Sequence, residues 1–377
     1  MTRPGMTTIL VEPNPFGHRF QAVAEVAAVA GRSGGVVLLT SKSARSTDWF
    51  RSFLDGLPIE VVERYDGVYP PTREMAKGVA EVARECAAST VVVMDADESL
   101  KRWWYAAALE FRGLPSRPRV VFMLTRYIAR LELLDYHGWY LRISKAILVL
   151  LAMATRTLHR AAGFAGRDDL STGLVVKRLR DPAVNTAHSR ERDRIRRDLG
   201  LRRDRRIVGI IGAIDARKSV PLLYEATVAS ADDADLLVAG PVSDDVQKWL
   251  DARSPAERER MILRCRHLDN AELDQLVAAC DVVSVVQLNK GPSGIMGKAL
   301  TAQVPVVTGG SKVRACEVAV THGGLAAQMT VGSLANALRK LYGWDASAVG
   351  AAGLPPATAE AFAETLLGQS DVRAPVN

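Results

Sequence analysis

Cysteine, aromatic side chains and long apolar runs are all scarce in this sequence. The 377 residues include four cysteines, and no two of them have the C-x-x-C spacing of zinc knuckles or redox dithiols. So few cysteines in a long chain are typical of a reducing cytoplasm, and we expect a cytoplasmic protein. Because aromatic residues make up only 6% of the chain, its hydrophobic cores should be mostly aliphatic.

The sequence also lacks signal-peptide and membrane-span patterns. The N-terminal segment TRPGMTTILVEPNP has one arginine and no continuous apolar core before a cleavage site. The longest notable apolar run, 146–155, has ten residues, whereas a spanning helix needs about 20. Basic residues flank this run within a predicted helix over 139–162. Two interpretations stay open: a helix that faces the core of the first domain, or an interfacial helix that makes peripheral contact with the inner face of the membrane.

Acidic residues do not balance the basic ones, and the net charge is +7. Between Thr186 and Arg206, nine arginines stand against four acids. Nucleic-acid binding is one interpretation of such a run. However, the acids are interleaved at helical spacings, and no aromatic residue stands among the arginines to stack on bases. We favour a solvated, salt-bridged helix at a domain junction and expect no nucleic-acid partner.

Short β-branched runs alternate with helical segments through both halves, which predicts parallel strands buried on both faces. In the first half the predicted strands are 7–11, 35–40, 59–62, 90–94 and 119–124, and the predicted helices are 18–30, 75–88 and 139–162. In the second half the predicted strands are 206–211, 235–239, 261–264, 281–286 and 304–308, and the predicted helices are 221–229, 244–252, 270–279 (N-cap Asn270) and 297–302.

This pattern predicts an α/β fold with two tandem, doubly wound Rossmann-like domains, 1–185 and 186–354. A C-terminal helix and tail, 355–377, should pack back on the first domain. The carboxyl ends of the strands in both sheets would then face one cleft, which is the default ligand site.

Three loops that follow predicted strands are candidates for ligand binding. In the first, 14–18, Gly17 and His18 open a helix whose free amides suit an anion, although a plain tight turn is an equal alternative. The lack of G-x-G-x-x-G makes a dinucleotide site there weakly supported. In the second, 212–219, Arg217 and Lys218 lie beside a helix N-terminus and suit a diphosphate; the alternative is a solvated pair.

The third loop, 289–298, joins a buried strand to a helix and is rich in glycine. Its amides suit phosphate oxygens, with Ser293 as a hydroxyl donor and Lys290 and Lys298 as counter-charges. The alternative is a glycine-rich connection with exposed lysines. Across the second and third loops, the predicted donor-binding residues are Gly212, Asn289, Ser293, Gly294, Ile295 and Lys298.

The second half resembles the donor domain of GT-B glycosyltransferases, in particular the large retaining GT4 group (glycosyl transferases group 1). The matching segments run in the family's order and spacing from Ile207 to Leu341, and the first half is a looser match. They read IVGIIGAIDARKSVPLLYEA, DLLVAGPV, LDNAELDQLVAACDVV, GPSGIMGKALTAQVPVVTGG and TVGSLANALRKL. The resemblance implies that the second domain binds a nucleotide-activated sugar and the first domain binds a small-molecule or glycan acceptor.

The motifs of the family are matched unevenly. Its diphosphate-binding lysine falls on Lys218, while its preceding arginine falls on Ala213, which leaves Arg217 as a substitute. Its Glu-x7-Glu pattern falls on Lys290 and Lys298. Lysine cannot accept hydrogen bonds from sugar or ribose hydroxyls, so donor recognition must differ here.

In the first domain, the catalytic-cleft histidine of the family falls near Thr125-Arg126, which makes Arg126 a candidate acceptor-cleft residue with Gly17 and His18. A rival motif is Asp95-Ala-Asp97, which has the DxD form of metal-dependent GT-A enzymes. The second-half segments favour GT-B over that rival.

The resemblance implies a hexosyltransferase-type enzyme that acts with retention and needs neither a metal nor another cofactor. The leaving diphosphate would deprotonate the acceptor on the same face, and Arg217, Lys218 and Lys290 would stabilise the developing charge. Abundant alanine and arginine suggest a GC-rich, actinobacterial-type genome, in which such transfers serve secondary metabolites or surface glycans. The alternative is a GT-B protein that binds a sugar phosphate, or couples a cyclitol or aminosugar unit, without ordinary transfer. The oligomeric state stays open.

Overall fold

The computed structural model describes residues 6–16, 19–349 and 354–368. The chain forms two compact units. The first contains residues 1–165, 170–180 and 358–377, and the second contains 166–169 and 181–357. The last helix of the chain therefore belongs to the first unit, where it packs beside the first helix.

In its described part, the first unit contains a sheet of seven parallel strands in the order β3-β2-β1-β4-β5-β6-β7. The strands are β1 (Thr8–Val11), β2 (Val36–Ser41), β3 (Glu60–Tyr65), β4 (Thr90–Val93), β5 (Arg119–Leu124), β6 (Arg160–Ala165) and β7 (Val176–Arg180). The α-helices are α1 (Arg19–Ala30), α2 (Asp48–Phe53), α3 (Thr72–Glu85), α4 (Leu100–Glu110), α5 (Tyr136–Ala154) and α14 (Ala359–Leu367). The strand order reverses between β1 and β4, and open α/β sheets bind ligands at such a switch point.

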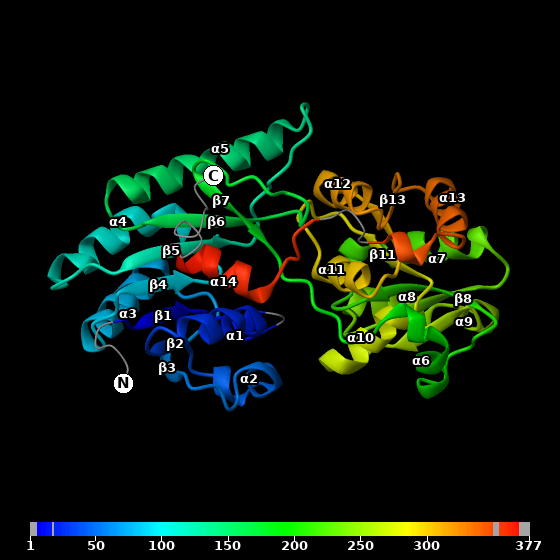
Figure 1. Ribbon diagram of the computed structural model, residues 1–377, viewed down its shortest axis with the longest axis horizontal. Coiled ribbons are helices and arrows are strands. Elements are labelled where there is room, and N and C mark those ends of the chain that lie inside the picture. Colours follow the sequence, from blue (N-terminus) through cyan, green and yellow to red (C-terminus); the bar gives the residue numbers. More distant parts are fainter. Residues whose placement is uncertain (1–5, 17–18, 350–353, 369–377) are drawn as a thin grey trace. The chain divides into compact units, whose positions relative to one another are not determined.

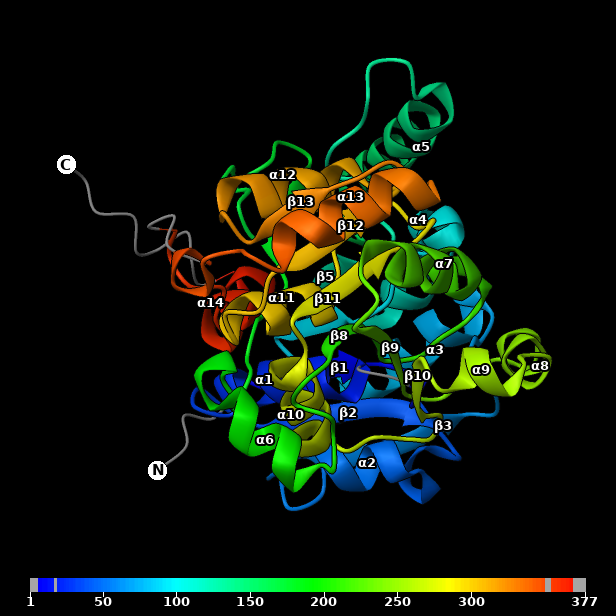
Figure 2. The same ribbon diagram turned by 90° about the vertical axis from the view of Figure 1, so that its right-hand side faces the viewer.

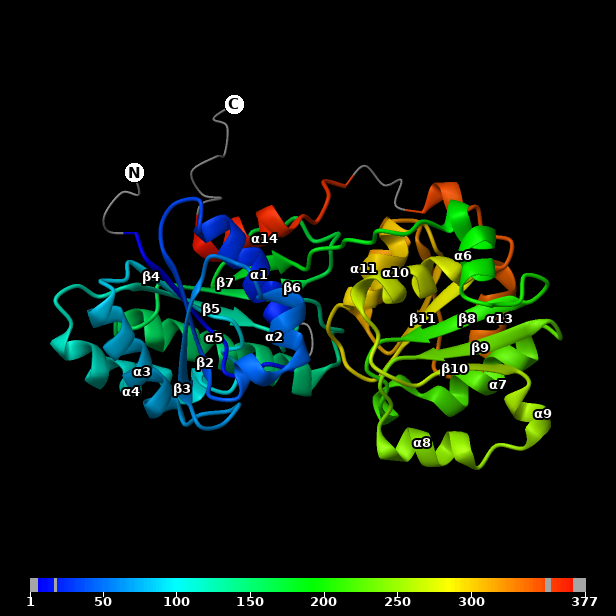
Figure 3. The same cartoon turned by 90° about the horizontal axis from the view of Figure 1, so that it is seen from below.

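Neighbouring residues of β1 face two different layers of helices. Ile9 and Val11 pack in a core with α3, α4 and α5, whereas Leu10 packs in a core with α1, α2 and α14. Figures 1 and 3 show these two sets of helices on opposite faces of the sheet. Burial on both faces explains why the strand is continuously apolar.

The predicted helix over 139–162 is wrong at its C-terminal end. α5 ends at Ala154, Arg156 adopts a left-handed φ of +56°, and β6 begins at Arg160. The β6 sequence, RAAGFA, has no β-branched residue, and a Cβ on Gly163 would lie 2.6 Å from Cγ of Tyr127. Small side chains are therefore required in β6, and their pattern reads as a continuation of the Ala-rich helix.

The described part of the second unit contains six parallel strands in the order β10-β9-β8-β11-β12-β13. The strands are β8 (Arg206–Ile211), β9 (Ala234–Ala239), β10 (Met261–Arg264), β11 (Val282–Val286), β12 (Val306–Gly309) and β13 (Gly324–Ala326). The α-helices are α6 (Arg192–Asp198), α7 (Val220–Ser230), α8 (Asp244–Asp251), α9 (Pro255–Arg258), α10 (Asn270–Ala279), α11 (Gly294–Thr301), α12 (Lys312–Val320) and α13 (Val331–Leu341). The order reverses between β8 and β11, which is the switch point of this sheet.

Two helical layers also cover this second sheet. One core contains residues of α6, α10 and α11, and the other contains residues of α7, α8 and α13. Figure 2 shows α7 and α13 on one side of the strands and α6 and α10 on the other. The five strands predicted here are present, but the predicted N-cap is wrong: the Asp269 side chain, not Asn270, accepts from the Glu272 amide at 2.8 Å.

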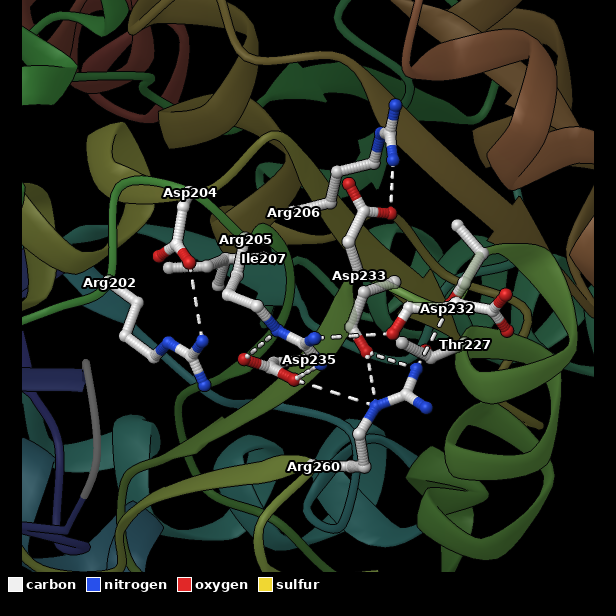
Figure 4. Close-up of polar contacts among 12 residues, drawn as sticks. Arg202, Asp204, Arg205, Arg206, Ile207, Thr227, Asp232, Asp233, Asp235 and Arg260 are labelled. Atoms are coloured by element: carbon white, nitrogen blue, oxygen red, sulfur yellow. Dashed lines mark hydrogen bonds and ion pairs between the residues drawn. The ribbon is translucent and has the colours of Figure 1, made fainter.

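The arginine run between residues 186 and 206 is held largely by ion pairs. Arg196 pairs with Asp281 at 2.6 Å, and Arg205 pairs with Asp235 at 2.5 Å. Arg206 pairs with Asp233, which directly precedes β9. Figure 4 shows the last two pairs, together with Arg260, around the beginnings of β8 and β9. Six of the nine arginines pair with acids among the described residues. The run therefore has a structural role: it stabilises the second unit where β8 and β9 begin (Figure 4).

Candidate functional site

After β8 and after β9, two glycines with positive φ let their backbone segments lie very close together. Gly212 adopts φ +91°, and Gly240, which follows β9, adopts φ +126°. A Cβ on Gly240 would lie 2.3 Å from the Gly212 carbonyl oxygen, so only glycine fits there. A Cβ on Gly212 would lie 3.5 Å from Nζ of Lys218 and 3.6 Å from Ile295. The loops after β8 and β11 thus meet at the switch point of the sheet.

Lys218 points inward at this position. Its ammonium donates to the Ile211 carbonyl oxygen at 2.6 Å, and burial lowers its pKa to about 8. Lys218, Ser293 and Ile295 line one small cavity at the carboxyl ends of β8 and β11. The structure therefore brings together four predicted donor-site residues: Gly212, Lys218, Ser293 and Ile295.

Arg217 points away from that cavity. Its side chain is 67% exposed and forms a bidentate ion pair with Asp215, which also caps the turn through the Arg217 amide. The side-chain hydrogen bond from Arg217 lowers the pKa of Asp215. Adjacent positions in the sequence thus have opposite roles: Arg217 closes a turn at the surface, and Lys218 lies in the site.

Lys298 is held by its own unit. Its Nζ lies 2.6 Å from an oxygen of the buried Asp274 on α10 and 3.0 Å from the Val184 carbonyl oxygen. The other Asp274 oxygen accepts from the amide and hydroxyl of Thr186 at 2.9 Å. Of the remaining predicted residues, Lys290 and Asn289 lie exposed on the loop after β11, and Gly294 is the exposed first residue of α11.

Two buried arginines hold the loop after β11 by its carbonyl groups. Arg314 on α12 is fully buried and donates at 2.8 Å to the carbonyl oxygens of Gln287, Asn289 and Gly291. It also donates to Gly309 at 2.8 Å, and burial lowers its pKa to about 10. A guanidinium with several fixed donors can fasten a loop in this way, whereas an ammonium cannot match its planar geometry.

Arg167 fastens the next part of the loop. It donates to the Ser293 carbonyl oxygen at 3.2 Å and forms ion pairs of 2.9 Å with Glu317 and Asp181. Its guanidinium lies against the backbone of α11, because a Cβ on Gly297 would be 2.5 Å from Cζ of Arg167. The N-terminus of α11 therefore rests on a buried, charge-compensated arginine.

In the first unit, polar residues follow three neighbouring strands. Gly17 and His18 lie outside the described residues, but Glu12 follows β1, Asp95 follows β4 and Thr125 follows β5. Arg19 joins the first two: it lies 2.5 Å from Asp95 and 3.5 Å from the buried Glu12. Burial raises the pKa of Glu12 to about 8, despite the opposing effect of Arg19.

Both carboxylates of the Asp95-Ala-Asp97 motif bind cations of this unit. Asp95 pairs with Arg19, and Asp97 accepts from Nζ of Lys145 at 2.5 Å. The hydroxyl of Thr125 lies within 3.1 Å of both. Internal pairing thus accounts for this motif. In the described part of the chain, no group of three or more His, Cys, Asp or Glu side chains is arranged to hold a metal ion.

A pocket of about 620 Å³ opens at the same edge of the first sheet. Its lining includes Glu12, Arg19, Asp95 and Arg126, and Arg126 forms a 2.7 Å ion pair with Glu98, which also lines the pocket. This volume is within the range of small-molecule sites. Of the predicted acceptor residues, Arg126 is therefore found beside a ligand-sized pocket.

An apolar stripe on α5 is exposed. Tyr136, Tyr140, Ile143, Ile147 and Leu150 recur at helical spacing, and each is at least half exposed. The opposite face packs on the unit through buried residues such as Val149 and Ala152. Among the described residues, no helix has both the length and the apolar character that crossing a bilayer requires.

Comparison with known proteins identifies the architecture. No protein-family model matches the sequence, and no curated protein matches it significantly. Among solved structures, Anabaena Alr3699/HepE in complex with UDP matches with TM-score 0.63 and 14% identity over 97% of this chain and 98% of that one. The chain has the GT-B fold.

Two further structures share this GT-B architecture. WaaG, a glycosyltransferase of lipopolysaccharide biosynthesis, matches with TM-score 0.60 and 15% identity over 98% of this chain and 96% of that one. The sucrose-phosphate synthase of Thermosynechococcus elongatus matches with TM-score 0.65 and 14% identity over 98% of both chains. Identity this low establishes the fold alone.

The residues that sequence reasoning missed in this GT-B chain are Arg167, Arg314 and Glu12. Arg167 binds the Ser293 carbonyl and Glu317, which lie 126 and 150 positions away, and Arg314 binds three carbonyls that lie 23 to 27 positions away. Contacts this distant leave no local pattern. Glu12 had a weak signal, since a carboxylate directly after a fully buried strand is a candidate for a ligand-facing position.

Proposed function

We propose that the protein is a glycosyltransferase that moves a sugar from a nucleoside-diphosphate donor to an acceptor hydroxyl. The observation that carries this proposal is the position of Lys218, whose desolvated ammonium lies between Gly212 and the start of α11 at the switch point of the second sheet. Cations and helix N-termini in a water-poor site stabilise phosphate charge strongly. The HepE structures that share the fold hold UDP and UDP-glucose, which supports a uridine nucleotide as the first donor to test.

In this proposal, the bond between the anomeric carbon and the diphosphate oxygen breaks as the acceptor oxygen bonds to the same carbon from the same face. The leaving diphosphate takes the acceptor proton, so the configuration is retained and the scheme requires no metal ion. Lys218 stabilises the negative charge that develops on the leaving group, and Lys290 adds to the positive potential of the loop after β11. Arg217 contributes little, because Asp215 compensates its charge. The remaining hydroxyls of the donor need acceptors other than Lys298, whose ammonium is bound by Asp274.

Turnover tests this proposal. The purified full-length chain is given UDP-, GDP-, ADP- and dTDP-sugars with a panel of sugar and polyol acceptors, and glycosylated product is detected by mass spectrometry. We expect product with one nucleotide class and a loss of at least a hundredfold in Lys218→Ala. The matched control, Arg217→Ala, removes a neighbouring cation that points to solvent and should retain most activity. Saturable sugar-phosphate binding without product from any donor would instead favour the non-transferring alternative.

We also propose that α5 docks the protein peripherally on an anionic membrane surface from the cytoplasm. The stripe of Tyr136, Tyr140, Ile143, Ile147 and Leu150 is exposed, and the segment 101–165 that contains it has eleven Lys and Arg against three Asp and Glu. An exposed apolar stripe in a strongly basic segment suits acidic headgroups over acyl chains.

Vesicle co-sedimentation tests the docking. We expect binding to phosphatidylglycerol vesicles that exceeds binding to phosphatidylcholine vesicles and falls with salt. Ile143→Glu combined with Ile147→Glu should abolish it. Val320→Glu places a charge at an exposed apolar site on the second unit and serves as the control. Equal binding by both variants, or concentration-dependent dimers that the stripe variant disrupts, would contradict a lipid partner.

A further inference from the structure

The pocket in the first unit lies at the switch point between β1 and β4, where Glu12 and Asp95 end adjacent strands. Its lining includes the apolar residues Val68 and Pro71, from the segment between β3 and α3, and Met75 on α3. It also includes Lys101 and Arg102 in the first turn of α4. A ligand here would therefore meet apolar surface as well as charged side chains.

Two cations in the lining of this pocket, Lys101 and Arg102, are not paired with an acid in the described part of the chain. Both are exposed, and neither forms an ion pair or side-chain hydrogen bond with any residue in the described ranges. They also occupy the first turn of a helix, where the helix dipole disfavours cations. Two uncompensated cations side by side in the lining of a pocket suit an anionic ligand.

The lining of the pocket includes a buried group with an atom that is unpaired among the described residues. Glu12 is 1% exposed; its Oε1 accepts from the Asn14 amide at 3.0 Å, and its Oε2 has no hydrogen-bond partner in the described chain. Nearby, the Tyr69 hydroxyl accepts from Nδ2 of Asn14 at 3.0 Å, so its own proton is available for donation. Buried polar atoms nearly always form a hydrogen bond, so an unpaired one in the lining of a pocket points to a hydrogen-bonding ligand.

We propose that this pocket binds the acceptor as a phosphorylated polyol, with the phosphate on Lys101 and Arg102 and a hydroxyl on Oε2 of Glu12. The proposal rests on the proposed function only in naming the ligand as acceptor. The two cations match the charge of a phosphomonoester, which is near −2 at neutral pH. Because the pKa of Glu12 is raised to about 8, its carboxyl is largely protonated at pH 7, so it can donate to or accept from a hydroxyl. The phosphate can belong to a free polyol phosphate or to a lipid headgroup.

Calorimetric titration of the full-length protein without nucleotide tests the pocket separately from the transferase activity. The probes are glucose 6-phosphate, glucose and inorganic phosphate. We expect saturable binding of glucose 6-phosphate, at least tenfold weaker binding of glucose and of phosphate, and unchanged binding of glucose 6-phosphate in Lys218→Ala. If no donor is turned over, binding of glucose 6-phosphate would still support the pocket. If glucose 6-phosphate does not bind, the proposed donor site is unaffected.

Variants locate the site. Lys101→Ala combined with Arg102→Ala should weaken glucose 6-phosphate at least tenfold. The control, Arg112→Ala combined with Arg117→Ala, removes two exposed cations of the same unit outside the pocket and should change nothing. Glu12→Leu removes both the donor and the acceptor of this carboxyl, and it should weaken glucose 6-phosphate without affecting inorganic phosphate. Equal affinity in the Lys101/Arg102 and control variants would overturn the proposal, as would phosphate binding as tightly as glucose 6-phosphate.

The source of the phosphate is resolved with vesicles. If glucose 6-phosphate does not bind, vesicles that carry phosphatidylinositol 4-phosphate, whose headgroup has a phosphomonoester on a polyol, are tested against the same two double variants. Loss of vesicle binding in the Lys101/Arg102 variant but not in the control would assign the phosphate to a lipid headgroup. Equal loss in both variants would show general charge attraction and overturn the site.

Discussion

The guanidinium of Arg167 lies so close to Gly297 that a Cβ on this glycine would be 2.5 Å from Cζ of the arginine. The same guanidinium pairs with Glu317 and Asp181, and it donates to the Ser293 carbonyl at the start of α11. The glycine-rich loop therefore has a fixed shape because a buried arginine occupies the space that a side chain would need.

Gly297→Ala should displace Arg167 and move the start of α11. We expect the free energy of unfolding to fall by roughly 1–3 kcal/mol, because overpacking a buried contact costs about this much. Donor binding should weaken as well. The control is Gly332→Ala in the first turn of α13, since a Cβ there meets nothing within 4 Å. Urea unfolding and UDP titration measure both effects, and equal behaviour of the two variants would contradict the role of Arg167.

Arg314→Met should release the loop after β11. It removes the donors to the carbonyls of Gln287, Asn289 and Gly291, and it leaves these three oxygens without their arginine donor. We expect a loss of about 3 kcal/mol or more in unfolding free energy, together with faster hydrogen exchange over 287–293. Arg339→Met on the exposed face of α13 should change stability by less than about 0.5 kcal/mol. Unchanged exchange in Arg314→Met would show that the loop is held by other contacts.

Donor affinity should depend on pH through Lys218. Its pKa is lowered to about 8 by burial, with Asp215 opposing and Arg217 adding to that effect. The ammonium is charged below this pH and loses its proton above it, while the phosphates of UDP stay ionised. The Kd for UDP should therefore rise between pH 7.5 and 9.5, approaching tenfold per unit at most. In Lys218→Met the Kd should be higher and flat across this range; a parallel pH dependence in the variant would assign the titration elsewhere.

Stability should depend on pH through Glu12. Its pKa is raised from 4.5 to about 8, with Arg19 and Asp95 as the facing charged groups. Between these two pH values the folded state holds a proton that the unfolded state has lost, so stability falls as pH rises through this window. The slope is at most roughly 1.4 kcal/mol per pH unit. The difference in unfolding free energy between wild type and Glu12→Gln should shrink or reverse toward pH 8, and a constant difference from pH 5 to 8 would contradict the raised pKa.

The sequence predicts most of the fold because both sheets are built from continuous apolar strands. Runs such as 206–211 and 119–124 leave no alternative to buried parallel strands, and their bounds match β8 and β5. β6 is missed because its sequence contains no β-branched residue, and the close packing of Gly163 on Tyr127 excludes a larger side chain at that position. Prediction from local sequence patterns thus fails at positions where a tertiary contact determines which residue type fits.

The same reasoning separates the site residues. Lys218 is predictable because a glycine turn, two cations and a helix start are adjacent in sequence. The ion pair of Lys298 with Asp274 joins residues 24 positions apart on facing helices, and Arg167 meets Glu317 across 150 positions. Nothing local distinguishes a lysine that binds a ligand from one that binds a buried aspartate.

The central claim is that Lys218 and the loops after β8 and β11 form a nucleoside-diphosphate site. Calorimetric titration of UDP, GDP, ADP and dTDP into wild type, Lys218→Ala and Arg217→Ala tests it most directly. The account predicts that one nucleotide binds wild type and Arg217→Ala with similar affinity, and binds Lys218→Ala at least tenfold more weakly. Binding of no nucleotide, or equal binding by Lys218→Ala, would contradict it.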